Sequence, residues 1–216
     1  FSSSFVLPSA IDHSMNTAMT EGKKSKVRVR EATSKDIPAL VALNRAAYPL
    51  LAEDNVVWGE SHLTSHQRLF PHGQLVAEVR GRIVGAAASL VVHLGSEPLR
   101  YHTWAGITDS GYFTNHDLKG DTLYGADVYV HPDSRGHGVG AALYQARRDL
   151  CRRLNLRRIL AGGRLWNYSE QPVQTTPEEY AQRVAAGEIR DLVLSFQLRE
   201  GFVLRGVMPN YLKDPR

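Results

Sequence analysis

The order of strand-like and helix-like segments in this sequence predicts an α/β fold, in which helices flank one mixed sheet within a single domain. Three observations support this prediction. Apolar side chains alternate in several short segments, as in half-buried strands. In other segments they recur every three or four residues, as in amphipathic helices. The 216 residues suit one domain, and 43% hydrophobic with 22% charged residues is an ordinary globular composition.

The first elements of the domain are expected from residue 27 onward. Apolar and polar side chains alternate over 27–30, as in a strand. Thr33 or Ser34 can cap the helix that follows, which has Pro38 in its first turn. The elements expected next are a short helix at 58–70, strands at 74–79 and 83–92, and an irregular excursion at 95–121.

The second half is expected to alternate strands and helices. A strand at 122–130 precedes a helix at 140–155, whose apolar stripe comprises Leu143, Ala146, Leu150 and Leu154. The elements expected after it are a strand at 158–161, a helix that starts near Pro177, a helix at 191–200 and a strand at 202–207. The fold is therefore expected to comprise 27–216 as one domain, with an insertion at about 164–190.

Residues 1–26 are expected to lie outside this domain, as a flexible tail or an expression remnant, because they carry no extended apolar core. Cys151 is the only cysteine, so the chain forms no intrachain disulfide and is expected in a reducing compartment, the cytoplasm. No apolar run approaches the length that crosses a bilayer, so no membrane association is expected.

The formal charge of +4 is mildly basic and favours a phosphorylated ligand. Much of the excess lies in the helix at 140–155 and just after it, and we interpret these arginines as a solvated helix face. They are Arg147, Arg148, Arg152, Arg153, Arg157 and Arg158. A nucleic-acid surface would interleave aromatic residues with the arginines, and none follows Tyr144 in this stretch, so nucleic acid is not an expected partner.

The most specific pattern is the turn that leads from strand 122–130 into the next helix. It reads Arg135-Gly136-His137-Gly138-Val139-Gly140. Glycines let a pyrophosphate approach the backbone, and the first helical amides have no intrahelical partner. The amides of Gly136–Ala141 can therefore converge on a diphosphate, with Arg135 as a fixed positive group beside them. The absence of Gly-Lys-Ser/Thr excludes a triphosphate P-loop, and the residues about 20 positions on are basic, unlike those of a dinucleotide fold.

This Arg-x-x-Gly-x-Gly pattern after an apolar strand resembles the acyl-CoA loop of the GNAT acetyltransferases. Ser195–Phe202 also resembles the last helix and terminal Gly-Phe of that family. The resemblance implies the GNAT fold, with a central mixed and mostly antiparallel sheet. It also implies acetyl-CoA as co-substrate and an N-acetyltransferase, in which a primary amine attacks the thioester directly in a ternary complex. The alternative is a non-catalytic acyl-CoA-binding module, acting as a sensor or as the docking half of a fusion.

Within that family, four short runs resemble the GNAT domains that are fused to carbon–nitrogen hydrolase (nitrilase-like) modules. They are Asp121–Asp127, Asn155–Arg158, Ala161–Arg164 and Pro209–Leu212. The acceptor implied is a small-molecule or peptide amine. The edge strands of such a sheet could also pair across a homodimer.

The resemblance implies a cofactor site along the end of the central strand and the loop. Its residues are Val128, Tyr129, Val130, Arg135, Gly136, His137, Gly138, Val139, Gly140 and Ala141. A backbone amide near Val130 would polarise the thioester carbonyl. Arg164 and Tyr168 open the insertion and are expected to border the acceptor pocket.

For catalysis we expect Asp127 as the base, with Tyr124 next. Strict alternation puts the two on opposite faces of the strand, although a bulge would change that phase. The alternative for Asp127 is a buried carboxylate paired with an arginine such as Arg164. In the family a tyrosine four residues before the Gly-Phe protonates the leaving thiolate, and this sequence has Gln197 there. Tyr168 and Tyr180 are possible substitutes; otherwise the thiolate leaves as an anion.

The remaining candidates are interpreted as structural. Cys151 lies near the apolar stripe of its helix and is expected in the core. His62 and His66 have the spacing of a helical metal pair but no evident third ligand, so they are expected on a solvated face and no metal is expected. His131 either is catalytic or simply belongs to a His-Pro turn.

Overall fold

The structure is a computed structural model that describes residues 3–10, 27–49, 57–94 and 102–212. Seven strands form one sheet in the order β2-β3-β4-β5-β6-β1-β7. Their bounds are β1 Ser3–Ala10, β2 Arg28–Glu31, β3 Gln74–Val79, β4 Arg82–Val92, β5 Thr122–Val130, β6 Arg158–Arg164 and β7 Gly206–Pro209. Only β5 and β6 run parallel, and the other pairs are antiparallel. The predicted mixed, mostly antiparallel α/β fold is therefore confirmed.

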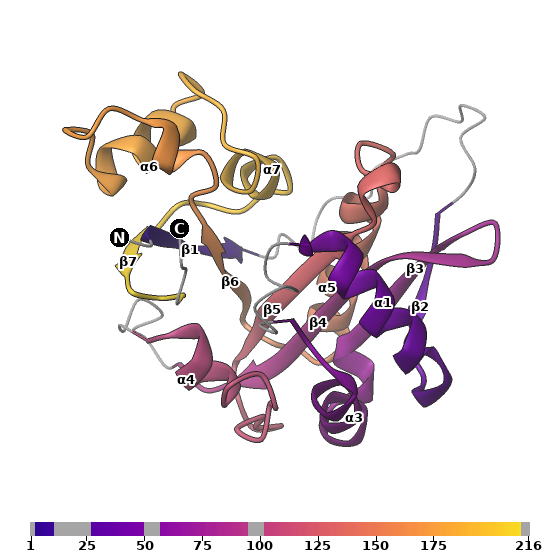
Figure 1. Cartoon of the computed structure of the whole chain (residues 1–216). Coiled ribbons are helices and arrows are strands. Elements are labelled where there is room, and N and C mark those ends of the chain that lie inside the picture. Colours follow the sequence, from indigo (N-terminus) through magenta and orange to yellow (C-terminus); the bar gives the residue numbers. More distant parts are fainter. Residues whose placement is uncertain (1–2, 11–26, 50–56, 95–101, 213–216) are drawn as a thin grey trace.

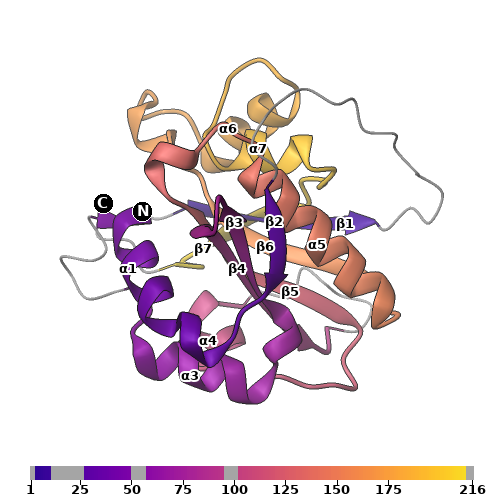
Figure 2. The same cartoon turned by 90° about the vertical axis from the view of Figure 1, so that its right-hand side faces the viewer.

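Helices cover both faces of this sheet (Figures 1 and 2). On one face, α1 and α3 pack against the central strands, and on the other α5 lies across β2 to β6. The shorter α6 and α7 pack on each other beside β6 and β7. Their bounds are α1 Ile37–Ala47, α3 Glu60–Leu69, α4 Trp104–Thr108, α5 Val139–Arg153, α6 Pro177–Ala185 and α7 Leu194–Arg199. The 3-10 turns are η1 Ser34–Asp36, η2 Pro71–Gly73, η3 Pro132–Ser134 and η4 Tyr168–Glu170.

The N-terminal segment differs from the prediction. Residues 1–26 were expected to lie outside the fold, but Ser3–Ala10 form β1, which pairs with β6 on one side and with β7 on the other. The physical reason is that β6 and β7 each offer an unpaired edge, and a strand between them satisfies both rows of backbone groups. The short run Phe5-Val6-Leu7, flanked by serines and Pro8, carries too weak a periodicity to reveal this.

Two smaller differences concern segments late in each half. The last strand starts at Gly206 rather than at Phe202, whose side chain is 4% exposed and packs into the core. The predicted excursion at 95–121 contains the short helix α4, and residues 95–101 lie outside the described residues. Among the described helices, none has both the length and the apolar composition that crossing a bilayer requires.

The interpretation of the six arginines as a solvated helix face is wrong for two of them, one in α5 and one in β6. Arg147 is 1% exposed and Arg158 is 9% exposed. Arg158 donates from Nε to Thr122 Oγ1 over 2.9 Å, which ties the first residue of β6 to the first residue of β5. Arg147 lies on the buried side of α5, at four residues from Leu143 and three from Leu150.

Candidate active site

A bulge in β5 shapes the centre of the candidate site. Ala88 of β4 pairs with Asp127, and the next residue, Ser89, pairs with Gly125, so Ala126 is one extra residue on β5. An extra residue shifts the alternation of side chains beyond it. Tyr124 and Asp127 consequently lie on the same face of the sheet, the one that α1 covers.

The two parallel strands separate just after this bulge. The register of β5 with β6 ends at Gly125 opposite Ala161, and β6 continues beside β1 alone (Figure 1). The amide of His131 donates to Val84 of β4 over 2.8 Å. Because neighbouring amides of a strand point to opposite edges, the amide of Val130 faces the edge that β6 has left. This is where a thioester carbonyl could accept a hydrogen bond.

Asp127 lies on the α1 face beside that opening. The hydroxyl of Tyr48 donates to Asp127 Oδ1 over 2.7 Å, and Asn44 also donates to the carboxylate. Burial raises the pKa of Asp127 from 3.8 to about 6, while the Tyr48 hydrogen bond and the nearby Arg147 charge oppose the rise. The cation that influences Asp127 is thus Arg147, and not Arg164 as the alternative suggested. A carboxyl group with a pKa near neutrality suits a general base.

Tyr124 lies in a chain of hydrogen bonds on the same face. Its hydroxyl is 2.5 Å from that of Tyr211 and 3.1 Å from Nε2 of His102. The ring of Tyr211 packs closely against Gly162, where any Cβ would overlap it. Trp104 joins this group to the bulge, because its indole Nε1 donates to Ala126 O over 3.0 Å. Tyr211 and His102 are therefore site neighbours that were not candidates from the sequence, while Trp104 belongs to the excursion at 95–121, which was expected to shape the acceptor pocket.

Arg147 occupies the opposite face of β5, beneath the bulge. Its guanidinium donates to Ser89 Oγ over 3.0 Å, to Ala88 O over 2.7 Å and to Asp127 O. Gly125 leaves room for it, since a Cβ there would lie 3.1 Å from Nη1. All these acceptors belong to the bulge, so the side chain holds its irregular backbone in place. A buried arginine this close to Asp127 also lowers the energy of the carboxylate form.

The glycine loop has the geometry that a phosphate group requires. Gly136 and Gly138 have φ angles of 75° and 81°, in the left-handed region, and Gly138 is the N-cap of α5. Both are exposed, and no atom lies within 4 Å of a Cβ built at either position. The backbone of the loop is thus accessible just before α5, at the positive end of a 15-residue helix.

Arg135 and the last helix fix this loop to the rest of the domain. Arg135 donates from Nη2 to Ala47 O at the end of α1 over 3.0 Å, which holds its charge beside the loop. A Cβ at Gly140 would lie 2.7 Å from the ring of Phe196, so this glycine allows α7 to pack on the start of α5. His137 is exposed within the loop.

Gln197 of α7 is buried at 4% exposure and points toward α5. Its Nε2 donates to the hydroxyl of Tyr144 over 3.2 Å, while its Oε1 has no hydrogen-bond partner among the described residues. Tyr144 was not a candidate in the sequence analysis. Its spacing from Arg147 and Cys151 on α5 marks the same buried face, and that periodicity could have identified it.

The insertion holds Tyr168 and Tyr180 in a structural arrangement. Tyr180 is 0% exposed and its hydroxyl donates to Asp191 over 3.0 Å, so it is not placed to protonate a thiolate. The hydroxyl of Tyr168 donates to Thr175 O over 2.8 Å, and the guanidinium of Arg164 lies over the ring of Trp166. A role of Arg164 and Tyr168 in the acceptor pocket stays a prediction.

The other residues singled out from the sequence have structural roles. Cys151 is fully buried, as expected, and burial raises its pKa to about 12. His131 Nδ1 accepts from the amide of Asp133, which caps η3. The prediction that His66 lies on a solvated face is wrong. The residue is 1% exposed, and its Nε2 lies 2.6 Å from Gly111 O. Within the described ranges, no three His, Cys, Asp or Glu side chains are grouped so as to hold a metal ion.

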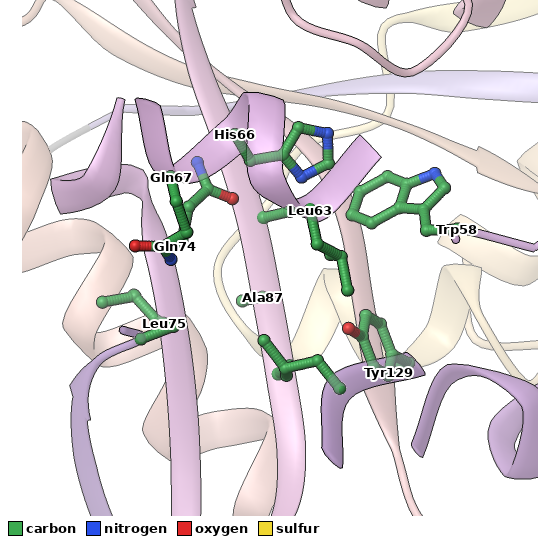
Figure 3. A pocket seen from close by; sticks show the side chains of 12 residues that line it. Trp58, Leu63, His66, Gln67, Gln74, Leu75, Ala87 and Tyr129 are labelled. Atoms are coloured by element: carbon green, nitrogen blue, oxygen red, sulfur yellow. The ribbon is translucent and has the colours of Figure 1, made fainter. Parts of the chain in front are cut away.

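A small cavity of about 20 Å³ lies between α3 and the sheet, away from the glycine loop. Figure 3 shows His66 and Trp58 at one end of it, and Tyr129 of β5 at the other. Tyr129 is 4% exposed and directed into this layer. Its side chain therefore belongs to the core, and only its backbone is available to a ligand.

The chain is similar in sequence to known proteins. The model of the acetyltransferase (GNAT) family matches residues 38–173. Two proteins of Bacillus subtilis (strain 168) are similar in sequence. The "Probable hydrolase YhcX" is 42% identical over 191 residues, which are 88% of this chain and 36% of that protein. The "Uncharacterized N-acetyltransferase YkwB" is 35% identical over 195 residues, 90% of this chain and 86% of that protein.

Solved structures share the fold. The loading GNATL domain of CurA from Lyngbya majuscula superposes with a TM-score of 0.71 at 19% identity, over 86% of this chain and 89% of that one. The GphF GNAT-like decarboxylase in complex with isobutyryl-CoA gives 0.65 at 24% identity, over 80% and 84%. The family model covers more than half of the chain, and YkwB is similar over most of both lengths. The chain therefore belongs to the GNAT acetyltransferase family.

Proposed function

We propose that this domain transfers an acyl group, most simply acetyl, from acyl-CoA to a primary amine. The observation that carries the proposal is that the exposed residues Gly136–Gly138 lead from the end of β5, where its opening to β6 lies, into the start of α5. A diphosphate on the amides of this loop directs the rest of a CoA molecule along the edge of β5. The thioester then reaches the amide of Val130, on the edge that faces away from β4. Membership of an acetyltransferase family supports this assignment.

The chemistry follows from the positions of these groups. The amide of Val130 donates to the thioester carbonyl and stabilises the oxyanion that forms there. Asp127 takes the proton that the amine loses as it attacks, either directly or through a water. Holding both reactants beside the bulge converts their encounter into a reaction within one complex. No metal has a part in this scheme.

The acceptor that we propose is a small-molecule or peptide amine, in the cytoplasm. The α1 face, where Asp127, Tyr48 and Tyr211 gather, offers hydroxyl and carboxylate groups that suit a polar amine. The 42% identity to a segment of YhcX supports the closer kinship to hydrolase-fused GNAT domains, and this chain spans about a third of that protein. We propose that the chain is equivalent to the acyltransferase part of such proteins.

A second candidate function is an acyl-CoA-binding module without turnover. The observation that favours it is Gln197, which stands where the family has its proton-donating tyrosine. Both functions require CoA binding at the loop, and only the transferase releases CoA in the presence of an amine.

The experiment measures the thermal unfolding midpoint with and without acetyl-CoA, for the wild-type protein and for Gly138→Glu. Ligand at about 100 times its dissociation constant stabilises a protein by about 2.7 kcal/mol. For a domain of this size that corresponds to a rise of roughly 5–10 °C. The Gly138→Glu variant is expected to lose the shift, because its carboxylate fills and repels the phosphate site.

The matched control is Gly187→Glu. Gly187 has a φ angle of 79°, and no atom lies within 4 Å of a Cβ there, so the substitution imposes the same strain away from the loop. It is expected to lower the midpoint and to keep the acetyl-CoA shift. A midpoint that saturating acetyl-CoA leaves unmoved in the wild type would remove the basis of the proposal.

A further inference from the structure

The buried amide of Gln197 presents an unexplained polar group. Its Oε1 has no partner among the described residues although the side chain is only 4% exposed. Leaving such an acceptor unpaired costs on the order of 1–3 kcal/mol. Its other end, Nε2, is fixed by the hydroxyl of Tyr144. An acceptor held in this way is available to a ligand that brings a donor, such as a thiol or an amide N–H of CoA.

Tyr144 offers the hydroxyl that position 197 lacks. It is 1% exposed, and its oxygen already accepts a hydrogen bond from Gln197 over 3.2 Å. The guanidinium of Arg147 lies 5.3 Å from the centre of its ring, one turn further along α5. Because the oxygen accepts from Gln197, the phenolic hydrogen is free to be donated to a third group.

The position of this hydroxyl relative to the opening between β5 and β6 is what gives it a role. Tyr144 packs in one cluster with Leu123 of β5 and with Ala161, the last residue of β6 that pairs with β5. Arg147, three residues on, contacts the carbonyl of Asp127 from the same side. Asp127 itself points to the α1 face, where Tyr48 binds it. A thioester between the strands thus has the base on one side and Tyr144 on the other.

We propose that Tyr144, held by Gln197, donates its hydroxyl proton to the CoA sulfur as the carbon–sulfur bond breaks. The inference rests on the proposed acyl transfer. The amine nitrogen forms a bond to the acyl carbon, and Asp127 takes the proton that the nitrogen loses. The sulfur leaves with the bonding electrons and receives the Tyr144 proton. Exchange with water then returns a proton to Tyr144 and removes one from Asp127, so that an amide and a thiol are the net products.

The test compares steady-state CoA release for three variants in the presence of an accepted amine. Tyr144→Phe keeps the ring and is expected to lower kcat by about 100-fold or more, the usual contribution of a general acid, with KM for acetyl-CoA unchanged. Adding Gln197→Tyr to that variant returns a hydroxyl to the same space from the facing helix. The double variant is expected to recover at least a tenth of the wild-type kcat, about 1.4 kcal/mol from full activity.

Phe202→Leu serves as the packing control. Phe202 contacts the ring of Tyr144 edge-on, with 5.2 Å between centroids, so this variant loosens the same cluster while keeping the hydroxyl. It is expected to lower the unfolding midpoint and to retain most of kcat.

Three results would overturn the role of Tyr144: wild-type kcat in Tyr144→Phe, no recovery in the double variant, or an equal loss in Phe202→Leu. The proposed function fails separately. In that case the wild-type protein itself releases no CoA with any amine, even though acetyl-CoA raises its unfolding midpoint.

Discussion

The two faces of β5 differ in charge and in the source of their polar groups. On the α1 face, Asp127 lies with the hydroxyls of Tyr48 and Tyr211, and its pKa is raised to about 6 by burial. On the α5 face, Gly125 removes a side chain and Arg147 fills the space with a buried cation. One extra residue, Ala126, lets a single strand present both environments within three positions. The difference places a proton acceptor on one side of the strand and a cation with a hydroxyl on the other.

Each face depends on the other through the sheet. Among the described residues, Arg147 donates to uncharged acceptors of the bulge and to the Tyr144 hydroxyl, and it forms no ion pair. Burying a cation without a paired carboxylate is costly, and the hydrogen bonds that Arg147 donates to the bulge offset that cost. The positive charge of Arg147 limits the rise in the pKa of Asp127 that burial causes, and so helps to keep this carboxyl ionised near neutral pH. A substitution of Arg147 on the α5 face is therefore expected to change the pKa of Asp127 on the α1 face.

The largest expected effect is that of Asp127→Asn. It removes the base and is expected to lower kcat by 2 to 4 orders of magnitude, roughly the range for general bases. In the wild type, kcat/KM should fall as the pH decreases through about 6, where Asp127 takes up a proton. This acid limb should be absent from the residual activity of the variant. The measurement is the pH–rate profile of CoA release.

The same substitution is expected to act oppositely on stability. The folded pKa of about 6 exceeds the ordinary 3.8, so the charged form is disfavoured in the fold and stability falls as the pH rises from 3.8 through 6. At pH 7, Asp127→Asn should therefore unfold at an equal or higher temperature than the wild type. A variant that is inactive because it is unstable would contradict the assignment.

The next effect concerns the α5 face. Arg147→Met leaves Ser89, Ala88 and Asp127 without their donor, and we expect a loss of unfolding free energy of about 3 kcal/mol. The acid limb of the rate profile should also move to higher pH, because a nearby positive charge is gone. Arg152→Met on the same helix removes an ion pair with Asp149 at the surface and should cost less than about 1 kcal/mol. Denaturant unfolding of both variants checks the comparison; equal losses would show that the bulge needs no buried cation.

A smaller effect concerns His66, which is expected to make the stability of the fold depend on pH without affecting catalysis. Burial lowers the pKa of His66 to about 4, from 6.5. Its stabilising contribution is complete above pH 6.5 and is lost as the pH falls from 6.5 to 4, by up to about 3 kcal/mol. His66→Gln should be less stable at pH 7 but lose less stability across that window. If the two proteins show the same slope of stability against pH, His66 is not buried in its neutral form.

The glycine loop could be predicted from the sequence, whereas the arrangement of the two faces of β5 could not. Loop, strand and helix around Gly136–Gly140 were predictable because their signals are local: an apolar strand, glycines and an amphipathic stripe. The bulge at Ala126 has no such signal, and without it the faces of Tyr124 and Asp127 stay ambiguous. Arg147 and Tyr144 occupy apolar-face spacings on α5, where a charged side chain is conventionally read as exposed. β1 was missed because its place is determined by strands more than 140 residues away.

A crystal structure of the protein with CoA bound tests most directly whether the thioester lies between Asp127 and Tyr144. We expect the pyrophosphate on the amides of Gly136–Ala141 and the sulfur within hydrogen-bonding distance of the Tyr144 hydroxyl, on the α5 side of β5. Asp127 should face the sulfur from across the opening between β5 and β6. A CoA molecule whose sulfur lies on the α1 face, or whose pyrophosphate avoids the glycine loop, would contradict this arrangement.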